Sequence, residues 1–245
     1  MHILGVIPAR YQSQRLPGKP LAMIGKRPMV QWVYEAAKRC PTLSRVTVAT
    51  DSEEVASCVR NFGGQVEMTR GDHATGTDRV AEVAERYAEM HVVVNIQGDQ
   101  PFVTPDMLTQ LVAPYARGER PEMTTLACPL DPETGYADPN VVKVVCDRHG
   151  RALYFSRAPI PYYRNTGPAP VFHHLGLYGF RRDFLLQYAQ LSATPLEHCE
   201  GLEQLRVLEH GYTIVVCQTQ KAVIEVNTPD DLRQAQALVA KGVEQ

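Results

Sequence analysis

Three short runs of apolar residues, each separated from the next by a segment with helical spacing, constrain the fold of this chain most strongly. The runs cover residues 2–7, 45–50 and 91–97. The run at 91–97 is rich in valine and has no polar alternation, which is typical of a strand covered on both faces. Apolar residues recur at helical spacing over 29–40. This order of strands and helices predicts a doubly wound α/β fold with a parallel sheet.

A loop rich in proline and in cations follows the first run. Arg10, Arg15 and Lys19 lie on it, and Pro17 and Pro20 prevent a regular helix before about residue 21. Arginine offers a planar fork of donors and lysine a compact charge, which are complementary ways to hold a polyphosphate. We interpret the segment as a phosphate-binding loop. A solvated basic loop is the alternative that the spacing leaves open.

A tight turn containing Asp99 follows the run at 91–97, and Thr104-Pro105 predicts the start of a helix soon after it. In open α/β sheets, ligands bind outside the carboxyl ends of the strands. We therefore expect Asp99 to face the same crevice as the cationic loop. Magnesium is usually held by one or two carboxylates together with substrate phosphates, so Asp99 is a candidate metal ligand. A helix cap is the alternative role.

Several local signals mark helix starts. Asp51 follows the run at 45–50 and could cap a helix, and Thr77 could cap another in the polar loop 70–79. That loop could contact a base or ribose, or be an ordinary capped turn. The run 222–226 is interpreted as a returning strand, and Thr228 as the cap of the last helix.

Composition excludes several classes of function. Lysine and arginine number 25 against 27 aspartate and glutamate residues among 245, so there is no basic excess of the kind that binds nucleic acid. No apolar run approaches the length of a membrane span, and the first residues lack a charged leader, so we expect a cytoplasmic protein. The six cysteines show no C-x-x-C pair, which argues against a zinc cluster or a disulfide framework.

The pattern changes after about residue 122, where shorter strands are predicted at 123–126, 141–146 and 175–180. We interpret this part as an inserted substrate lobe. Arg157 within it could bind a substrate carboxylate through two parallel hydrogen bonds. Glu203 and Gln204 lie in a helical pattern, where each could equally be a solvated surface residue.

Taken together, these segments resemble the 3-deoxy-manno-octulosonate cytidylyltransferase (CMP-Kdo synthetase) family over essentially the whole chain. The matching segments are specific, because they occur together and in order. They are 7–11, 15–20, 75–79, 97–101, 152–157, 174–178, 195–198 and 202–206.

The resemblance implies a Rossmann-like, GT-A-like α/β nucleotidyltransferase with a mostly parallel central sheet. It implies one domain over 1–245, with a smaller substrate and dimerisation lobe inserted at about 122–215. An enzyme of this family would use CTP and Mg²⁺ to transfer CMP to the anomeric hydroxyl of 3-deoxy-D-manno-octulosonate (Kdo), releasing pyrophosphate for lipopolysaccharide biosynthesis. It would usually be a homodimer, with no nucleic-acid partner and no membrane insertion.

By position, the resemblance also implies residue roles. The residues expected at CTP are Pro8, Ala9, Arg10, Arg15, Lys19, Arg70, Thr75, Gly76, Thr77 and Gln97. Those expected at the sugar acid are Gln97, Arg157, His174, Tyr178, Glu203 and Gln204. Arg10, Arg15, Lys19 and Asp99 would be the catalytic residues, and the metal would lie on Asp99 and residue 227.

One departure from the family pattern affects the expected metal site. The family commonly has an aspartate before the last helix, where this chain has Asn227. The amide still offers a carbonyl oxygen, so we expect magnesium binding that is weaker or more dependent on CTP. Two alternatives stay open: a cytidylyltransferase for a related acid, such as 8-amino-Kdo or a nonulosonic acid, and a non-catalytic nucleotide-binding subunit.

Overall fold

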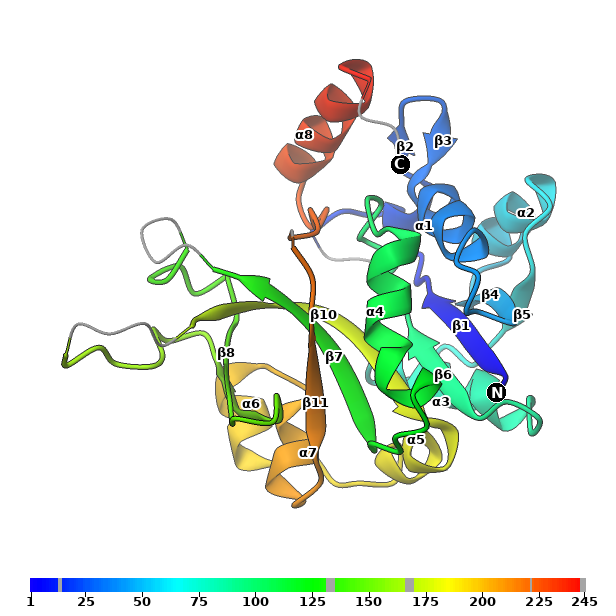
Figure 1. Ribbon diagram of the computed structural model, residues 1–245. Helices are drawn as coiled ribbons and strands as arrows, with labels where there is room; N and C mark the ends of the chain where they lie inside the picture. Colours follow the sequence, from blue (N-terminus) through cyan, green and yellow to red (C-terminus); the bar gives the residue numbers. More distant parts are fainter. Residues whose placement is uncertain (13–14, 131–134, 166–169, 221, 243–245) are drawn as a thin grey trace. The chain divides into compact units, whose positions relative to one another are not determined.

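The computed structural model describes residues 1–12, 15–130, 135–165, 170–220 and 222–242 (Figure 1). These residues form two compact units. The first unit consists of Met1–Thr109 with Val223–Gln245, and the second unit of Gln110–Ala222. Among the described residues, no helix is both long enough and apolar enough to cross a lipid bilayer.

A parallel sheet forms the centre of the first unit. Its strands follow the order β6-β1-β4-β5. Their bounds are Ile3–Pro8 for β1, Arg45–Thr50 for β4, Val66–Met68 for β5 and Val92–Asn95 for β6. The three strands predicted from the apolar runs, β1, β4 and β6, are confirmed. In the register, Val6 of β1 lies opposite Asn95 of β6, so both strands end at the same edge of the sheet.

Helices pack on this sheet and bury their apolar stripes against it. The helix α1 (Met29–Lys38) contacts β4, as does α2 (Glu53–Asn61), while α3 (Gly76–Glu85) contacts β1. The apolar stripe of α1 is fully buried, which confirms the predicted helical spacing. The remaining elements of the unit are short or terminal: η1 (Lys19–Leu21), β2 (Met23–Ile24), β3 (Arg27–Pro28) and α8 (Pro229–Ala240). The helix α4 (Pro105–Ala116) begins in this unit, at the predicted proline.

The second unit is built on a mixed sheet. In it β10 is antiparallel to both β7 and β8, β11 is parallel to β7, and β8 is antiparallel to β9. The strand bounds are Met123–Pro129 (β7), Lys143–Cys146 (β8), Ala152–Ser156 (β9), Phe172–Arg181 (β10) and Ile214–Gln218 (β11). The helices are α5 (Arg182–Tyr188), α6 (Pro195–Glu200) and α7 (Leu205–Glu209). The three predicted strands are confirmed, although β10 is longer than expected, and β9 and β11 were not predicted.

The strand expected at 222–226 is wrong, because this segment is in no strand. Its buried side chains are Val223 and Val226, three residues apart, whereas a strand buries every second residue. Val226 packs with Ile24 and Trp32 in a small apolar cluster. The β-branched composition therefore reflects burial against this cluster and not sheet pairing.

Two predicted helix caps are also wrong, each by one or two positions. Ser52, and not Asp51, caps α2, since its hydroxyl accepts a hydrogen bond from the Val55 amide. Thr75, and not Thr77, caps α3. The predicted cap of α8 at Thr228 is confirmed. Asp51 instead pairs with Arg79 of α3, and the side chain of Arg79 is completely buried.

Candidate active site

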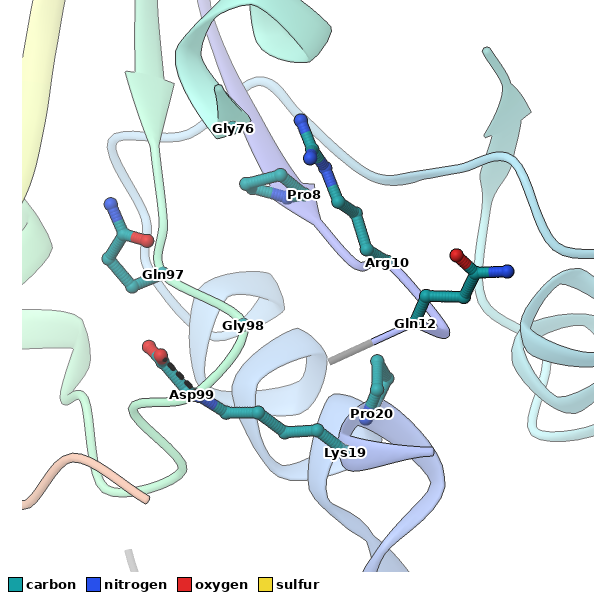
Figure 2. Close-up of a pocket in the computed structure, with 9 residues that line it drawn as sticks. All are labelled: Pro8, Arg10, Gln12, Lys19, Pro20, Gly76, Gln97, Gly98 and Asp99. Carbon is teal, nitrogen blue, oxygen red and sulfur yellow. Dashed lines mark hydrogen bonds and ion pairs between the residues drawn. The ribbon is translucent and has the colours of Figure 1, made fainter. Parts of the chain in front are cut away.

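The loop after β1 and the turn after β6 enclose a pocket in the first unit. Its volume is about 250 Å³, and it lies beyond the carboxyl ends of both strands (Figure 2). The lining residues are Pro8, Arg10, Gln12, Lys19, Pro20, Gly76, Gln97, Gly98 and Asp99. Asp99 therefore faces the cationic loop, as the strand order predicted.

A close approach of two backbone segments shapes the floor of this pocket. A Cβ atom at Gly98 would lie 2.8 Å from the carbonyl oxygen of Pro8, which is too close for any side chain. Glycine thus allows the turn after β6 to pass directly beside the end of β1. The neighbouring side chains Gln97 and Asp99 both extend from this turn at the pocket (Figure 2).

Lys19 connects two oxygens from distant parts of the chain. Its ammonium Nζ donates to Asp99 Oδ2 at 2.7 Å and to Asn227 Oδ1 at 3.0 Å. Arg15 Nη2 lies 3.4 Å from the same amide oxygen. The Val226 amide donates to the Asp99 carbonyl oxygen at 2.9 Å, which holds the segment before α8 against the turn after β6. Arg15, Lys19, Asp99 and Asn227 therefore meet, although more than 200 residues separate the first from the last.

The oxygens of Asp99 and Asn227 fit a divalent cation. Both accept from one positive charge, the ammonium of Lys19, so the two oxygens face the same point. Carboxylate and amide oxygens are the hard ligands that Mg²⁺ prefers, and Mg²⁺ usually completes its shell with water and substrate phosphates. The side chains of Lys19 and Asp99 are 15% and 25% exposed, so a ligand can reach the pair.

A second network fixes the loop 70–75 beside the cationic loop. Arg10 Nη2 donates to the carbonyl oxygen of His73, and His73 Nε2 lies 2.5 Å from Glu82 Oε2 in α3. The same carboxylate oxygen accepts from the Arg70 amide at 3.1 Å. Desolvation opposes ionisation of Glu82, but the hydrogen bonds from His73 and the Arg70 backbone lower its pKa, so it stays a carboxylate. The guanidinium of Arg70 is largely exposed.

The start of α3 brings backbone to the pocket. Thr75 Oγ1 accepts from the Asp78 amide at 3.1 Å, and Asp78 Oδ2 accepts from the Thr75 amide at 2.9 Å. Gly76 follows and lines the pocket beside Pro8. The Thr77 side chain is buried, and its hydroxyl accepts from Asn95 Nδ2 of β6 at 3.0 Å. In the segment 75–77, which was predicted to contact the nucleoside, Gly76 thus lines the pocket, whereas the Thr77 side chain points toward the sheet.

Ala9 has a structural position beside these residues. It is buried, and its amide donates to the Ala49 carbonyl oxygen at 2.9 Å, which continues the pairing of β1 with β4. Its side chain therefore lies in the core, and contact with a nucleotide at this position would be through the backbone.

In the second unit, three of the predicted sugar-acid residues form one directed chain of hydrogen bonds. Tyr178 OH donates to Gln204 Oε1 at 3.0 Å, and Gln204 Nε2 lies 3.4 Å from His174 Nδ1. His174 Nε2 lies 2.8 Å from the hydroxyl of Thr125, which donates to the Leu177 carbonyl oxygen at 2.8 Å. Because the Thr125 proton is used in that bond, His174 Nε2 carries a proton and Nδ1 accepts.

This chain of hydrogen bonds requires a neutral imidazole at His174. The side chain is buried, and this desolvation, helped by the nearby His173, lowers the pKa of His174 to about 3. A bulge in β10, with Gly176 at a positive φ of 67°, places His174 and Tyr178 with ring centroids 5.6 Å apart. All three side chains are buried, and most of their polar atoms already face one another.

Arg157 lies in another network of the second unit. Its Nε donates to the Glu200 carbonyl oxygen at 2.8 Å and its Nη1 to the Pro139 carbonyl oxygen at 2.9 Å. The carboxylate of Glu200 accepts from the Arg157 amide at 2.9 Å and from Ser156 Oγ at 2.6 Å. Backbone carbonyls therefore already accept from two of the three guanidinium nitrogens. Glu203 is half-buried, and its carbonyl oxygen accepts from Tyr188 OH at 3.3 Å.

Comparison with known proteins identifies the family. The cytidylyltransferase family profile matches residues 4–214. A relative from Acaryochloris marina, named 3-deoxy-manno-octulosonate cytidylyltransferase, is 69% identical over 99% of both chains. The chain belongs to the 3-deoxy-manno-octulosonate cytidylyltransferase family. A family member from Syntrophotalea carbinolica is 50% identical over 97% of this chain and 98% of its own length.

A solved structure supports the same family assignment and the predicted fold class. CMP:2-keto-3-deoxy-manno-octonic acid synthetase, determined as a complex with CTP, matches with a TM-score of 0.94 and 41% identity over 99% of this chain and all of the other. A 4-diphosphocytidyl-2C-methyl-D-erythritol synthase from Anaerococcus prevotii shares the fold with a TM-score of 0.64, at 12% identity, over 98% of this chain and 96% of the other. The expected α/β nucleotidyltransferase fold with a mostly parallel sheet is confirmed.

Sequence reasoning missed three residues that hold predicted ones in place. Thr125 fixes the imidazole of His174, Glu200 holds the backbone of Arg157, and Glu225 contacts Asn227. Thr125 and Glu200 lie 49 and 43 residues from their partners, so no spacing rule relates them. Glu225 is two residues from Asn227, and the replaced charge at 227 was the signal that could have drawn attention to it.

Proposed function

We propose that this protein transfers CMP from CTP to the anomeric hydroxyl of Kdo, giving CMP-Kdo and pyrophosphate for lipopolysaccharide biosynthesis. The observation that carries the proposal is the meeting of Lys19, Asp99 and Asn227 at the carboxyl ends of β1 and β6. This arrangement combines a cation for phosphates with oxygen ligands for a metal. The relatives' names supply the identity of the nucleotide and the acid.

The reaction needs positioning and charge neutralisation, and no covalent enzyme intermediate. The anomeric oxygen bonds to the α-phosphorus, the bond to the bridging oxygen of the β-phosphate breaks, and the hydroxyl proton passes to solvent. Arg10, Arg15 and Lys19 hold the triphosphate and offset the charge that develops on pyrophosphate. The bond from Arg10 to the His73 carbonyl fixes that guanidinium in place before CTP binds.

Mg²⁺ is the cofactor that we propose for this site, where Asp99 and Asn227 would hold it. When bound, it supplies neutralisation of phosphate charge and a lower pKa for a coordinated alcohol. Lys19 donates to one oxygen of each of these residues, so its ammonium would turn from them toward the phosphates of CTP.

The sugar acid is assigned to Gln97 and to residues of the second unit. The neutral His174 orients Gln204, which accepts from Tyr178, and none of these three side chains carries a charge that would repel an anion. Arg157 supplies the positive charge for the carboxylate, and backbone carbonyls already hold its Nε and Nη1. Half-buried Glu203 suits a sugar hydroxyl, which can donate to its carboxylate.

A pyrophosphate-release assay tests the function directly. The protein is incubated with CTP, Mg²⁺ and one of Kdo, 8-amino-Kdo or a nonulosonic acid, and the nucleotidyl product is identified by mass spectrometry. We expect the highest kcat/KM with Kdo, and no release when Kdo is omitted. A higher kcat/KM with either other acid would assign the protein to that acid. CTP binding without release for all three would indicate a non-catalytic subunit.

The proposed homodimer rests on the family resemblance, and the proposed cytoplasmic location rests on the expectation from the amino-acid sequence. Size-exclusion chromatography with light scattering gives the mass in solution, and a dimer predicts twice the chain mass of 27.3 kDa. Fractionation of cells that express the chain tests the location. A monomeric mass at micromolar concentration would contradict the dimer.

A further inference from the structure

The amide of Asn227 has to be held in one orientation for the proposed metal site to work. A side-chain amide presents an oxygen on one side and an NH₂ group on the other, and only the oxygen can bind a cation. An aspartate at this position has no such requirement, because its two oxygens are equivalent. Asn227 Oδ1 faces the ammonium of Lys19 at 3.0 Å and the Nη2 of Arg15 at 3.4 Å.

Glu225 lies on the opposite side of this amide. Asn227 Nδ2 donates to Glu225 Oε2 at 3.2 Å. The other carboxylate oxygen of Glu225 accepts from Gln100 Nε2 at 3.1 Å, and Gln100 is completely buried next to Asp99. The Gln100 amide therefore holds Glu225 in place, and Glu225 in turn holds the amide of Asn227. A carboxylate can only accept and an ammonium can only donate, so Glu225 and Lys19 select the same orientation of Asn227.

We propose that Glu225 is a positioning residue of the magnesium site: it holds the Asn227 oxygen toward Asp99 and restores the negative charge that an aspartate at 227 would carry. This inference rests on the proposed function only through the assignment of Mg²⁺ to Asp99 and Asn227. It alters the expectation from sequence that metal binding is weakened by Asn227. Glu225 compensates for the missing charge through a hydrogen bond that an aspartate could not make.

A double-mutant cycle on metal affinity tests this proposal without turnover. Mn²⁺ is titrated into the protein with saturating CTP and no sugar acid, and free Mn²⁺ is followed by electron paramagnetic resonance. Glu225→Gln should weaken Mn²⁺ binding about tenfold in the native background, because the new amide can also donate and no longer fixes Asn227. In the Asn227→Asp background the same change should be neutral or strengthen binding, because Glu225 then repels the introduced carboxylate.

Matched controls separate orientation from net charge and from folding. Asp230→Asn removes one negative charge from the same segment, where Asp230 is exposed and pairs with Arg233, and it should leave Mn²⁺ affinity within twofold. Thermal unfolding and CTP binding in EDTA should be the same for native protein and Glu225→Gln. Equal weakening by Glu225→Gln in both backgrounds, or by Asp230→Asn and Glu225→Gln alike, would overturn the proposal.

The same experiment distinguishes this inference from the proposed function. Opposite effects in the two backgrounds, together with no pyrophosphate release from CTP and Kdo, would support the role of Glu225 and reject the reaction. Pyrophosphate release together with an additive cycle would support the reaction and reject the role of Glu225.

Discussion

Asp99 is the single residue on which the proposed chemistry depends most. Its carboxylate is half-buried, accepts from Lys19, and stands at the end of β6 where a metal and phosphates would meet. His174 depends on its surroundings in another way, since burial lowers the pKa of its imidazole and keeps it neutral within a chain of hydrogen bonds.

Replacing Asp99 tests its metal role. Asp99→Ala removes the one carboxylate among the described residues that line the pocket. We expect kcat for pyrophosphate release to fall by at least about 100-fold, because transition-state charge loses its neutralisation. Steady-state kinetics measure this, and Asp106→Ala, at an acidic position in the first turn of α4, serves as the control. Turnover within threefold of native would contradict the role.

Burial of His174 predicts a specific pH dependence of stability. The pKa of His174 is about 3 in the folded protein and about 6.5 when unfolded, so below pH 6.5 the unfolded chain binds a proton that the folded chain does not. The free energy of unfolding should therefore fall as pH falls from about 6.5, and be unaffected by this group above it. Between pH 7 and 5 the loss amounts to about 2 kcal/mol.

Urea unfolding at pH 7 and pH 5 measures this effect. His174→Gln should lose about 2 kcal/mol less than native protein over this interval, since glutamine has no proton to bind. His173 and the carboxylates are shared by both proteins, so the difference between the two isolates His174. Parallel losses of stability in the two proteins would show that His174 titrates normally.

Helix starts and strand ends are the elements that present the site. The capping box of Thr75 and Asp78 fixes where α3 begins, and thereby places Gly76 at the pocket. The turn after β6 is fixed by the close approach of Gly98 to Pro8. These local features bring backbone groups, and not only side chains, to the pocket.

Removing the cap of α3 should therefore affect both stability and CTP binding. Thr75→Ala should lower the free energy of unfolding by about 1 kcal/mol, because the Asp78 amide loses its acceptor. It should also raise the KM for CTP severalfold, because the start of α3 frays at the pocket. Ser52→Ala, at the cap of α2, is the matched control: it should cost similar stability with no change in KM. Equal KM values for the two variants would contradict the placement of α3.

Across the whole molecule, the residues assigned to CTP and those assigned to the sugar acid belong mainly to different compact units. Every residue that lines the pocket belongs to the first unit, whereas five of the six predicted sugar-acid residues belong to the second. Nucleotide and acid are thus assigned mainly to different parts of the chain. The reaction requires both, so each unit alone holds an incomplete set of groups.

Hydrogen exchange measured by mass spectrometry tests this division. CTP with Mg²⁺ should slow exchange mainly at 75–77, at 97–99 and in the segment before α8, all in the first unit. Kdo with Mg²⁺ should slow exchange mainly in β10 around 174–178. The slow variant Asp99→Ala allows CTP and Kdo to be added together with little turnover during the measurement. Protection of β10 by CTP alone would contradict the assignment.

The strands β1, β4 and β6, the start of α4 and the cap of α8 were predictable from the amino-acid sequence, because hydrophobic periodicity and capping chemistry act over short distances. The position of Asp99 opposite the cationic loop was also predictable, since parallel strands end at one edge of a sheet. The strand prediction at 222–226 was wrong because composition cannot distinguish burial against Trp32 from pairing in a sheet. Only the tertiary structure brought Asn227 to Lys19 and Glu225 to Gln100, because contacts over 125 or 208 residues depend on how the whole chain packs.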